Sequence, residues 1–83
     1  MIIFETESKE LFIRALRETL DKYFPDAGRL RVVYKGAMRD EINRVTEYMV
    51  VIVDEEYFSA LVINIHRNEE TGLLFYVYTA ITE

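Results

Sequence analysis

Hydrophobic residues recur with the spacing of an α-helix in only one part of this chain, residues 7–24. Intervals of four residues place them on one side of a helix, and charged residues occupy the other side. Thr6 or Ser8 can cap the start of this helix, and Pro25 and Gly28 mark its end. The apolar stripe consists of Phe12, Ile13, Leu16, Leu20, Tyr23 and Phe24.

After Gly28 the apolar pattern changes from a helical period to the alternation of β-strands. Strands are predicted at 29–35, 45–53, 57–66 and 73–82, and the last three are joined by connections of hairpin length. Residues 36–44 fit a loop, a helical turn or the tip of a long hairpin. The pattern predicts a single α+β domain over residues 1–83, with one N-terminal amphipathic helix packed on a four-stranded antiparallel sheet.

Residues 1–4 are apolar enough to add a short strand before the helix, which gives the order β-α-β-β-β-β. This order resembles that of helix-grip folds such as the cystatins. Residues 32–36 bear a faint resemblance to the inhibitory hairpin signature of cystatins, because Arg31 replaces the glutamine that opens it. The likeness is therefore an analogy of topology and assigns no family.

Both faces of the predicted sheet are apolar. If Val53 lies opposite Tyr57 and Arg67 opposite Leu73, the odd-numbered residues share one aliphatic face, which we expect to meet the helix. That face comprises Met49, Val51, Val53, Leu61, Ile63, Ile65, Leu73, Phe75, Val77 and Ile81. The even-numbered residues form a second face that mixes aromatic, aliphatic and a few polar side chains.

A partner is one explanation for the second face, and cover by residues 36–44 or by the N-terminus is the other. Three strands about 4.8 Å apart give a patch on the order of 300 Å², which is within the range of ordinary monomers. Its aromatic content nevertheless favours a protein interface. The residues expected to make the contact are Tyr48, Phe58, Val62, Tyr76 and Tyr78, with Asp54, Glu55 and Glu56 as a second, electrostatic candidate.

Charge and composition narrow the classes of function. The net charge is −5, but residues 1–45 hold nine basic and eight acidic side chains, whereas residues 46–83 hold one and seven. The absence of cysteine removes disulfides, thiolate nucleophiles and cysteine-ligated zinc, and suits a cytoplasmic location. No apolar run approaches the roughly 20 residues that span a bilayer.

Motifs for chemistry are sparse. His66 is the single histidine, with Asn64 and Tyr76 as its expected neighbours. The acidic groups at 54–56 and 69–70 lack the glycine-containing spacing of a calcium loop, and the three glycines are too scattered to bind a phosphate. No metal or cofactor is therefore expected.

The leading hypothesis is a small non-enzymatic interaction protein, expected to form a homodimer and to bind another protein. Small inhibitors, antagonists and immunity proteins, including those of phages and mobile elements, have this profile. The alternative is single-stranded nucleic-acid binding, with Arg29, Arg31 and Lys35 contacting phosphates and tyrosines stacking on bases. An enzyme that uses His66 ranks third.

Overall fold

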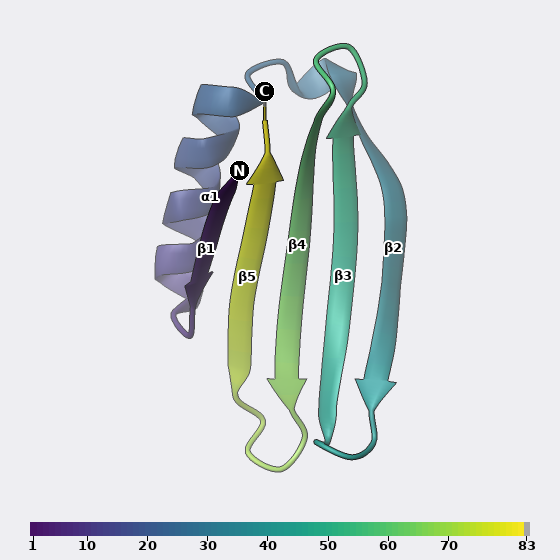
Figure 1. The fold of residues 1–83 in the computed structure, drawn as a ribbon. Helices are drawn as coiled ribbons and strands as arrows, with labels where there is room; N and C mark the ends of the chain where they lie inside the picture. Colours follow the sequence, from purple (N-terminus) through teal and green to yellow (C-terminus); the bar gives the residue numbers. More distant parts are fainter. Residues whose placement is uncertain (83) are drawn as a thin grey trace.

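A computed structural model describes residues 1–82 as one helical layer on a five-stranded antiparallel sheet (Figure 1). The strands are ordered β1-β5-β4-β3-β2 across the sheet, so that β4 is central and β1 and β2 form the edges. The elements in chain order are β1 (Ile2–Thr6), α1 (Lys9–Tyr23), the 3₁₀ turn η1 (Ala27–Arg29), β2 (Leu30–Asp40), β3 (Val45–Asp54), β4 (Ser59–Asn68) and β5 (Leu74–Ile81).

The α+β class and the single long helix are confirmed. Ser8 caps α1 by accepting a hydrogen bond from the Leu11 N–H at 3.2 Å, and Phe24 ends the helix. Phe12 and Phe24 of the predicted stripe are buried, whereas Ile13 is 39% exposed. No helix in residues 1–82 is long and apolar enough to cross a membrane.

The sheet has five strands, so the expectation of four was too low. The additional strand is β1, which pairs antiparallel with β5 from Ile2 opposite Ala80 to Thr6 opposite Tyr76. The chain reaches β2 at the opposite edge through α1 and η1. Residues 36–44 extend β2 to Asp40 and then form the β2–β3 hairpin tip, so neither they nor the N-terminus covers a sheet face.

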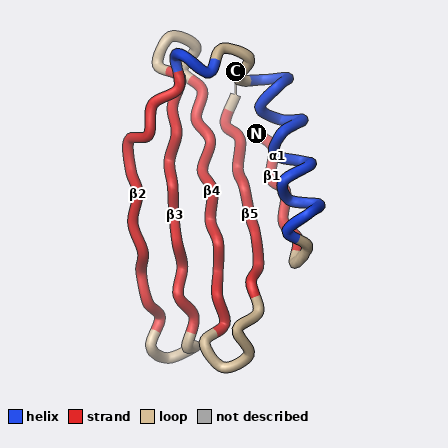
Figure 2. The backbone as a smooth tube through the Cα atoms, turned by 180° about the vertical axis from the view of Figure 1, so that it is seen from behind, coloured by secondary structure: helices blue, strands red, loops and turns tan. Residues whose placement is uncertain are grey.

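Helix α1 packs on β1 and β5 and leaves the rest of its side of the sheet without a second layer (Figure 2). A helix about 10 Å in diameter covers about two strands spaced 4.8 Å apart, and this sheet has five. The buried core therefore lies at one edge of the sheet. It consists of Phe12, Phe24, Leu61, Tyr76, Tyr78 and Ala80.

The predicted register was wrong by three residues at the β3–β4 hairpin and by one residue at the β4–β5 hairpin. Val53 lies opposite Ala60 rather than Tyr57, and Arg67 lies opposite Leu74 rather than Leu73. A slip by an odd number of residues moves every side chain of a strand to the other face. The aliphatic odd-numbered residues of β3 and β5 therefore point away from α1, and only those of β4 face it.

The side of the sheet turned away from α1, here called the far face, is not covered by any part of residues 1–82. Its side chains, read from the register of the four strand pairs, are Ile3 and Glu5 of β1; Phe75, Val77, Thr79 and Ile81 of β5; Ala60, Val62, Asn64 and His66 of β4; Glu47, Met49, Val51 and Val53 of β3; and Arg31, Val33, Tyr34, Gly36 and Met38 of β2.

Candidate interaction surface

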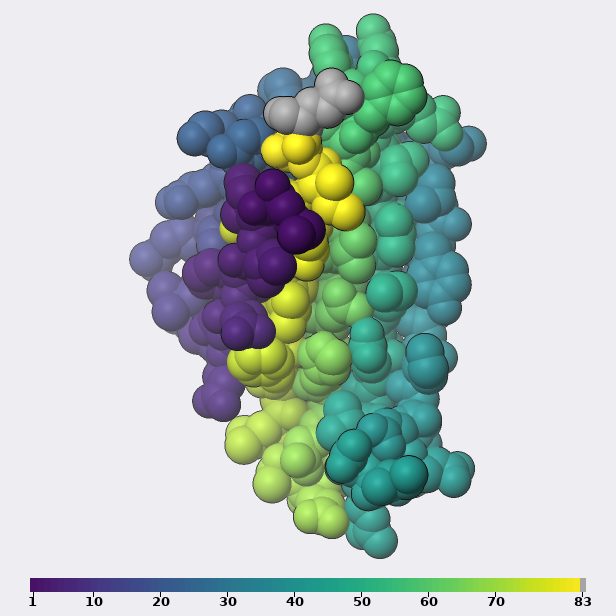
Figure 3. Space-filling model, in the orientation of Figure 1, coloured from purple at the N-terminus to yellow at the C-terminus, as the bar shows by residue number. Residues whose placement is uncertain are grey.

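The middle of the far face is built from side chains of all five strands, and Figure 3 views the molecule from this side. The register places one uncharged row straight across the sheet: Tyr34, Val51, Val62, Thr79 and Ile3. Tyr34 and Ile3 at the two edges are 51% and 60% exposed. An apolar surface of this extent on a small protein is typical of an interaction site.

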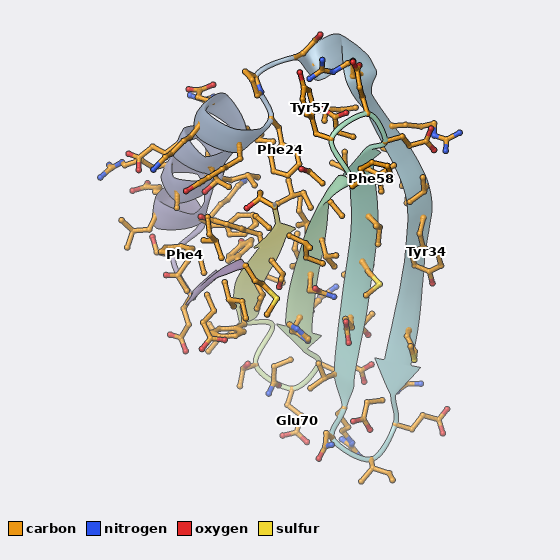
Figure 4. All side chains as sticks on the ribbon, turned by 45° about the horizontal axis from the view of Figure 1, so that its top comes forward. Phe4, Phe24, Tyr34, Tyr57, Phe58 and Glu70 are labelled. Carbon is orange, nitrogen blue, oxygen red and sulfur yellow. The ribbon has the colours of Figure 1, made fainter. Side chains whose placement is uncertain are left out.

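Phe58 extends this surface at the end of the sheet where β3 turns into β4. Its side chain is 78% exposed and, with Val33, Val53 and Ala60, lines a shallow apolar depression. Phe58 adopts φ 53°, a left-handed conformation that is unfavourable for a bulky residue. Figure 4 shows Phe58 next to Tyr57 in this turn. The turn thus presents an aromatic ring to solvent at a position where asparagine or glycine would be less strained.

Tyr34 lies along β2 because Gly36 leaves space for its ring. A Cβ atom built at Gly36 would lie 2.6 Å from the Tyr34 hydroxyl oxygen. Both residues belong to the far face, two positions apart on the same strand. The glycine therefore lets the tyrosine ring lie flat on the edge strand, where it broadens the apolar surface.

Polar groups gather at the other end of the far face. Glu47 and His66 are direct cross-strand neighbours, and the Asn64 side-chain N–H donates to Glu47 Oε1 at 2.7 Å. The ring of His66 lies 6.3 Å from that of Phe75. This arrangement brings a carboxylate and an imidazole together as adjacent groups on an open surface.

The predicted interaction residues separate into three locations. Val62 belongs to the far face, and Phe58 lies in the β3–β4 turn at the end of that face. Tyr48 lies on the helix side, over the half that α1 leaves open, and is 44% exposed. Tyr76 and Tyr78 are buried beneath α1, so assigning them to an interface was wrong because the β4–β5 register differs by one residue.

The acidic turn at 54–56 is not a free electrostatic site. Asp54 is only 2% exposed and accepts a hydrogen bond from the Arg29 guanidinium at 3.2 Å. Glu56 also pairs with Arg29, and Glu55 pairs with Arg31. Arg29 and Arg31, which were expected to form a separate basic strand, neutralise these carboxylates. Asp54, the most buried of the three, has a structural role: its carboxylate binds the Arg29 guanidinium.

The Arg29 guanidinium also lies 4.3 Å from the centre of the Tyr57 ring. Its contacts with the β3–β4 turn hold η1 against that turn at one end of the sheet. Spacing along the sequence gave no sign of this cluster, because Arg29 and the turn are more than 20 residues apart. Only the antiparallel pairing of β2 with β3 brings them together.

The predicted basic strand is divided by a β-bulge between Val32 and Tyr34. The bulge inserts one residue, so Arg31 lies on the far face opposite Val53, whereas Lys35 lies on the helix side opposite Val50. Arg29 is engaged by the acidic turn, as described above. The expectation that Arg29, Arg31 and Lys35 line one face was therefore wrong.

A second ion-pair cluster joins the two hairpins at the opposite end. Arg39 donates two hydrogen bonds to Glu69, at 2.7 and 3.0 Å, and Thr46 donates another at 3.1 Å. The hydrogen bonds from Arg39 hold the pKa of Glu69 below its usual value. The acidic residues of the β4–β5 loop therefore tie neighbouring hairpins together.

Within residues 1–82, no group of three or more histidine or carboxylate side chains is arranged to hold a metal ion. His66 has Asn64 on its own strand and on its own face, but Tyr76, its other expected neighbour, points to the helix side.

Comparison of the chain with protein-family models, with curated proteins and with solved structures found no match.

Proposed function

We propose that this protein is a non-enzymatic interaction module that forms a homodimer through its far face. The observation that carries the proposal is that one whole side of a five-stranded sheet is uncovered and apolar at its centre. In such a role the protein acts by binding another protein rather than by catalysing a reaction, as small inhibitors, antagonists and immunity proteins do.

The size of the far face supports a second copy as its occupant. Five strands about 4.8 Å apart, with a mean length of about nine residues at roughly 3.3 Å each, give roughly 700 Å² per copy. A dimer packed on this face would bury about 1,400 Å² in total, which matches a stable protein interface of standard size. The estimate of 300 Å² from sequence was low because it counted three strands.

The distribution of charge also favours self-association. Two identical surfaces can pack only if like charges do not meet, and the central row of the far face carries none. Arg31 at one end is neutralised by Glu55, and Glu5 lies at the sheet edge. The desolvated centre of such an interface would contain aliphatic and aromatic groups, which is the composition of interface cores.

Nucleic-acid binding is less well supported as the alternative. Phosphate contacts need several uncompensated cations on one surface. Arg29 and Arg31 pair with acidic residues, and Lys35 lies on the other side of the sheet from Arg31. The exposed Tyr48 near Lys35 is the one feature of the helix side that suits base stacking.

Sedimentation equilibrium on three single variants tests the proposal. Phe58→Asn suits the left-handed turn and removes the exposed ring, while Val62→Glu places a charge at the centre of the far face. Tyr48→Asn is the matched control, because it removes an exposed aromatic ring from the helix side. Circular dichroism of each variant reports whether the fold is intact.

The wild type is expected to be dimeric at micromolar concentration. Phe58→Asn is expected to weaken the dimer about tenfold, as loss of an interface aromatic typically does, and Tyr48→Asn should leave it unchanged. A wild type that stays monomeric at several hundred micromolar would overturn the proposal. Folded Phe58→Asn and Val62→Glu variants that both remain as dimeric as the wild type would also overturn it.

A further inference from the structure

We infer that the two copies are related by a two-fold axis that runs parallel to β4, between the two sheets, so that their strands point in the same direction. The inference rests on the proposed dimer and specifies its geometry. It follows from how polar and apolar side chains are ordered along the strands of the far face.

The register divides the far face into rows that cross the sheet at right angles to the strands. From the β3–β4 turn to the opposite end, the rows are Arg31, Val53, Ala60 and Ile81; then Tyr34, Val51, Val62, Thr79 and Ile3; then Gly36, Met49, Asn64, Val77 and Glu5; and then Met38, Glu47, His66 and Phe75. The first two rows are mostly apolar and carry no charged group apart from the paired Arg31. The last row is polar at its centre.

Closed face-to-face packing of aligned sheets allows two orientations of the axis. An axis parallel to the strands brings each row onto the same row of the second copy. An axis perpendicular to the strands reverses the rows, so that Val53 lies over Glu47 and Ala60 over His66 of the second copy. That arrangement buries polar groups against aliphatic ones, which give them no hydrogen-bond partner.

The parallel axis gives the polar groups partners of their own kind. β4 is the central strand, so Asn64 and His66 lie close to the axis and face their counterparts. An amide side chain both donates and accepts, and Asn64 can therefore pair with Asn64 of the second copy. Glu47 lies one strand away from the axis, which places the two Glu47 carboxylates on opposite sides of it.

The hairpin tips report the direction of the axis without disturbing the interface. The chain has no cysteine, so a single spin label can be attached through Ile42→Cys, in the β2–β3 tip, where the side chain is 94% exposed. The parallel axis places both tips at the same end of the dimer. With strands about 4.8 Å apart and sheets about 10 Å apart, the labels should be roughly 15–30 Å apart.

The perpendicular axis would place the two tips at opposite ends, separated by about the 41 Å length of the molecule. Pulsed dipolar spectroscopy on dimers labelled at Ile42→Cys distinguishes the two distances. Mixed dimers, with one copy labelled at Ile42→Cys and the other at Ala27→Cys, give the reciprocal measurement, because η1 lies at the other end of the sheet (Figure 1).

A short Ile42 distance combined with a long mixed distance supports the parallel axis. The reverse pair of distances overturns the inferred geometry but leaves the far-face dimer intact. Loss of all dipolar signal, with a monomeric mass in sedimentation, overturns the proposed dimer itself. Adding Val62→Glu to the labelled chain should abolish the short distance, which ties the measured contact to the far face.

Discussion

Replacing Tyr78 by phenylalanine would remove one oxygen atom from the buried contact between α1 and β5. The Tyr78 hydroxyl lies 2.7 Å from the Thr19 hydroxyl, and it also donates to the Ala15 carbonyl at 3.4 Å. Tyr78 is 3% exposed and Thr19 is 7% exposed. The Tyr78 ring, which stacks on Phe4 at 5.6 Å, would stay in place. The variant therefore isolates the hydrogen bond from the packing.

The expected loss in unfolding free energy is about 1–2 kcal/mol. A buried hydrogen bond contributes about 1 kcal/mol net, and the Thr19 hydroxyl left behind adds part of a desolvation penalty. For a domain of this size, each 1 kcal/mol lowers the melting temperature by roughly 4–8 °C. Thr19→Val should lose a similar amount. The double variant should lose little more than either single variant, because no unpaired hydroxyl then remains.

Urea unfolding followed by circular dichroism measures these differences. All variants must be compared at one protein concentration, because dimer formation raises apparent stability. Tyr76→Phe is the matched control, since its hydroxyl makes no hydrogen bond within residues 1–82 although the ring is equally buried beneath α1. It should change the unfolding free energy by less than about 0.5 kcal/mol.

Additive losses in the double variant would show that the two hydroxyls do not interact. A Tyr76→Phe loss as large as that of Tyr78→Phe would refute the assignment of the stabilising hydrogen bond to the Tyr78 hydroxyl. Either result would call into question the position of Tyr78 against Thr19 of α1.

Two further predictions concern the ion pairs at the ends of the sheet. In urea unfolding, Arg29→Met should lower the unfolding free energy by about 2–3 kcal/mol, because it leaves the buried Asp54 carboxylate without its cation. Replacing the exposed Arg31 by methionine should change the unfolding free energy by less than about 0.5 kcal/mol. Equal effects of the two substitutions would contradict a structural role for the Arg29–Asp54 pair. The pKa of Glu69 is lowered by hydrogen bonds from Arg39, so its stabilisation is present above the usual value of 4.5 and is lost as pH falls through the lower folded-state pKa. Thermal melts should therefore show a smaller loss of stability below pH 5 in Arg39→Gln than in the wild type. An identical decrease of melting temperature with falling pH in the two proteins would refute the stabilising role of the Arg39–Glu69 pair.

The sequence by itself determined the local elements. The apolar interval of four residues and the Ser8 cap specify one helix, because both act within a few residues of chain. The alternating runs likewise specify strands, and their hairpin-length connections make them antiparallel. A surplus of apolar sheet surface could also be predicted, since a single helix cannot cover both sides of a sheet.

Which residues form that surplus surface was decided by the tertiary structure. Apolar residues occupy both odd and even positions of β3, β4 and β5, so alternation does not say which set faces the helix. The four-residue turn at 55–58, with Phe58 in a left-handed conformation, places Val53 opposite Ala60, so the odd-numbered residues of β3 share a face with the even-numbered residues of β4. The β4–β5 register, in which Arg67 lies opposite Leu74, places Tyr78 in the core and Val77 outside.

The same limit applies at the two edges of the sheet. The bulge at Val33 sends Arg31 and Lys35 to opposite sides, although they are an even number of residues apart. The short β1 has a partner only because β5 ends beside it, a contact that spans nearly the whole chain. The periodicity of a segment shows that its side chains alternate between two faces. Which of the two sets faces the helix depends on how the strand pairs with its neighbours. For this protein that pairing decides which apolar surface belongs to the core and which is left for a partner.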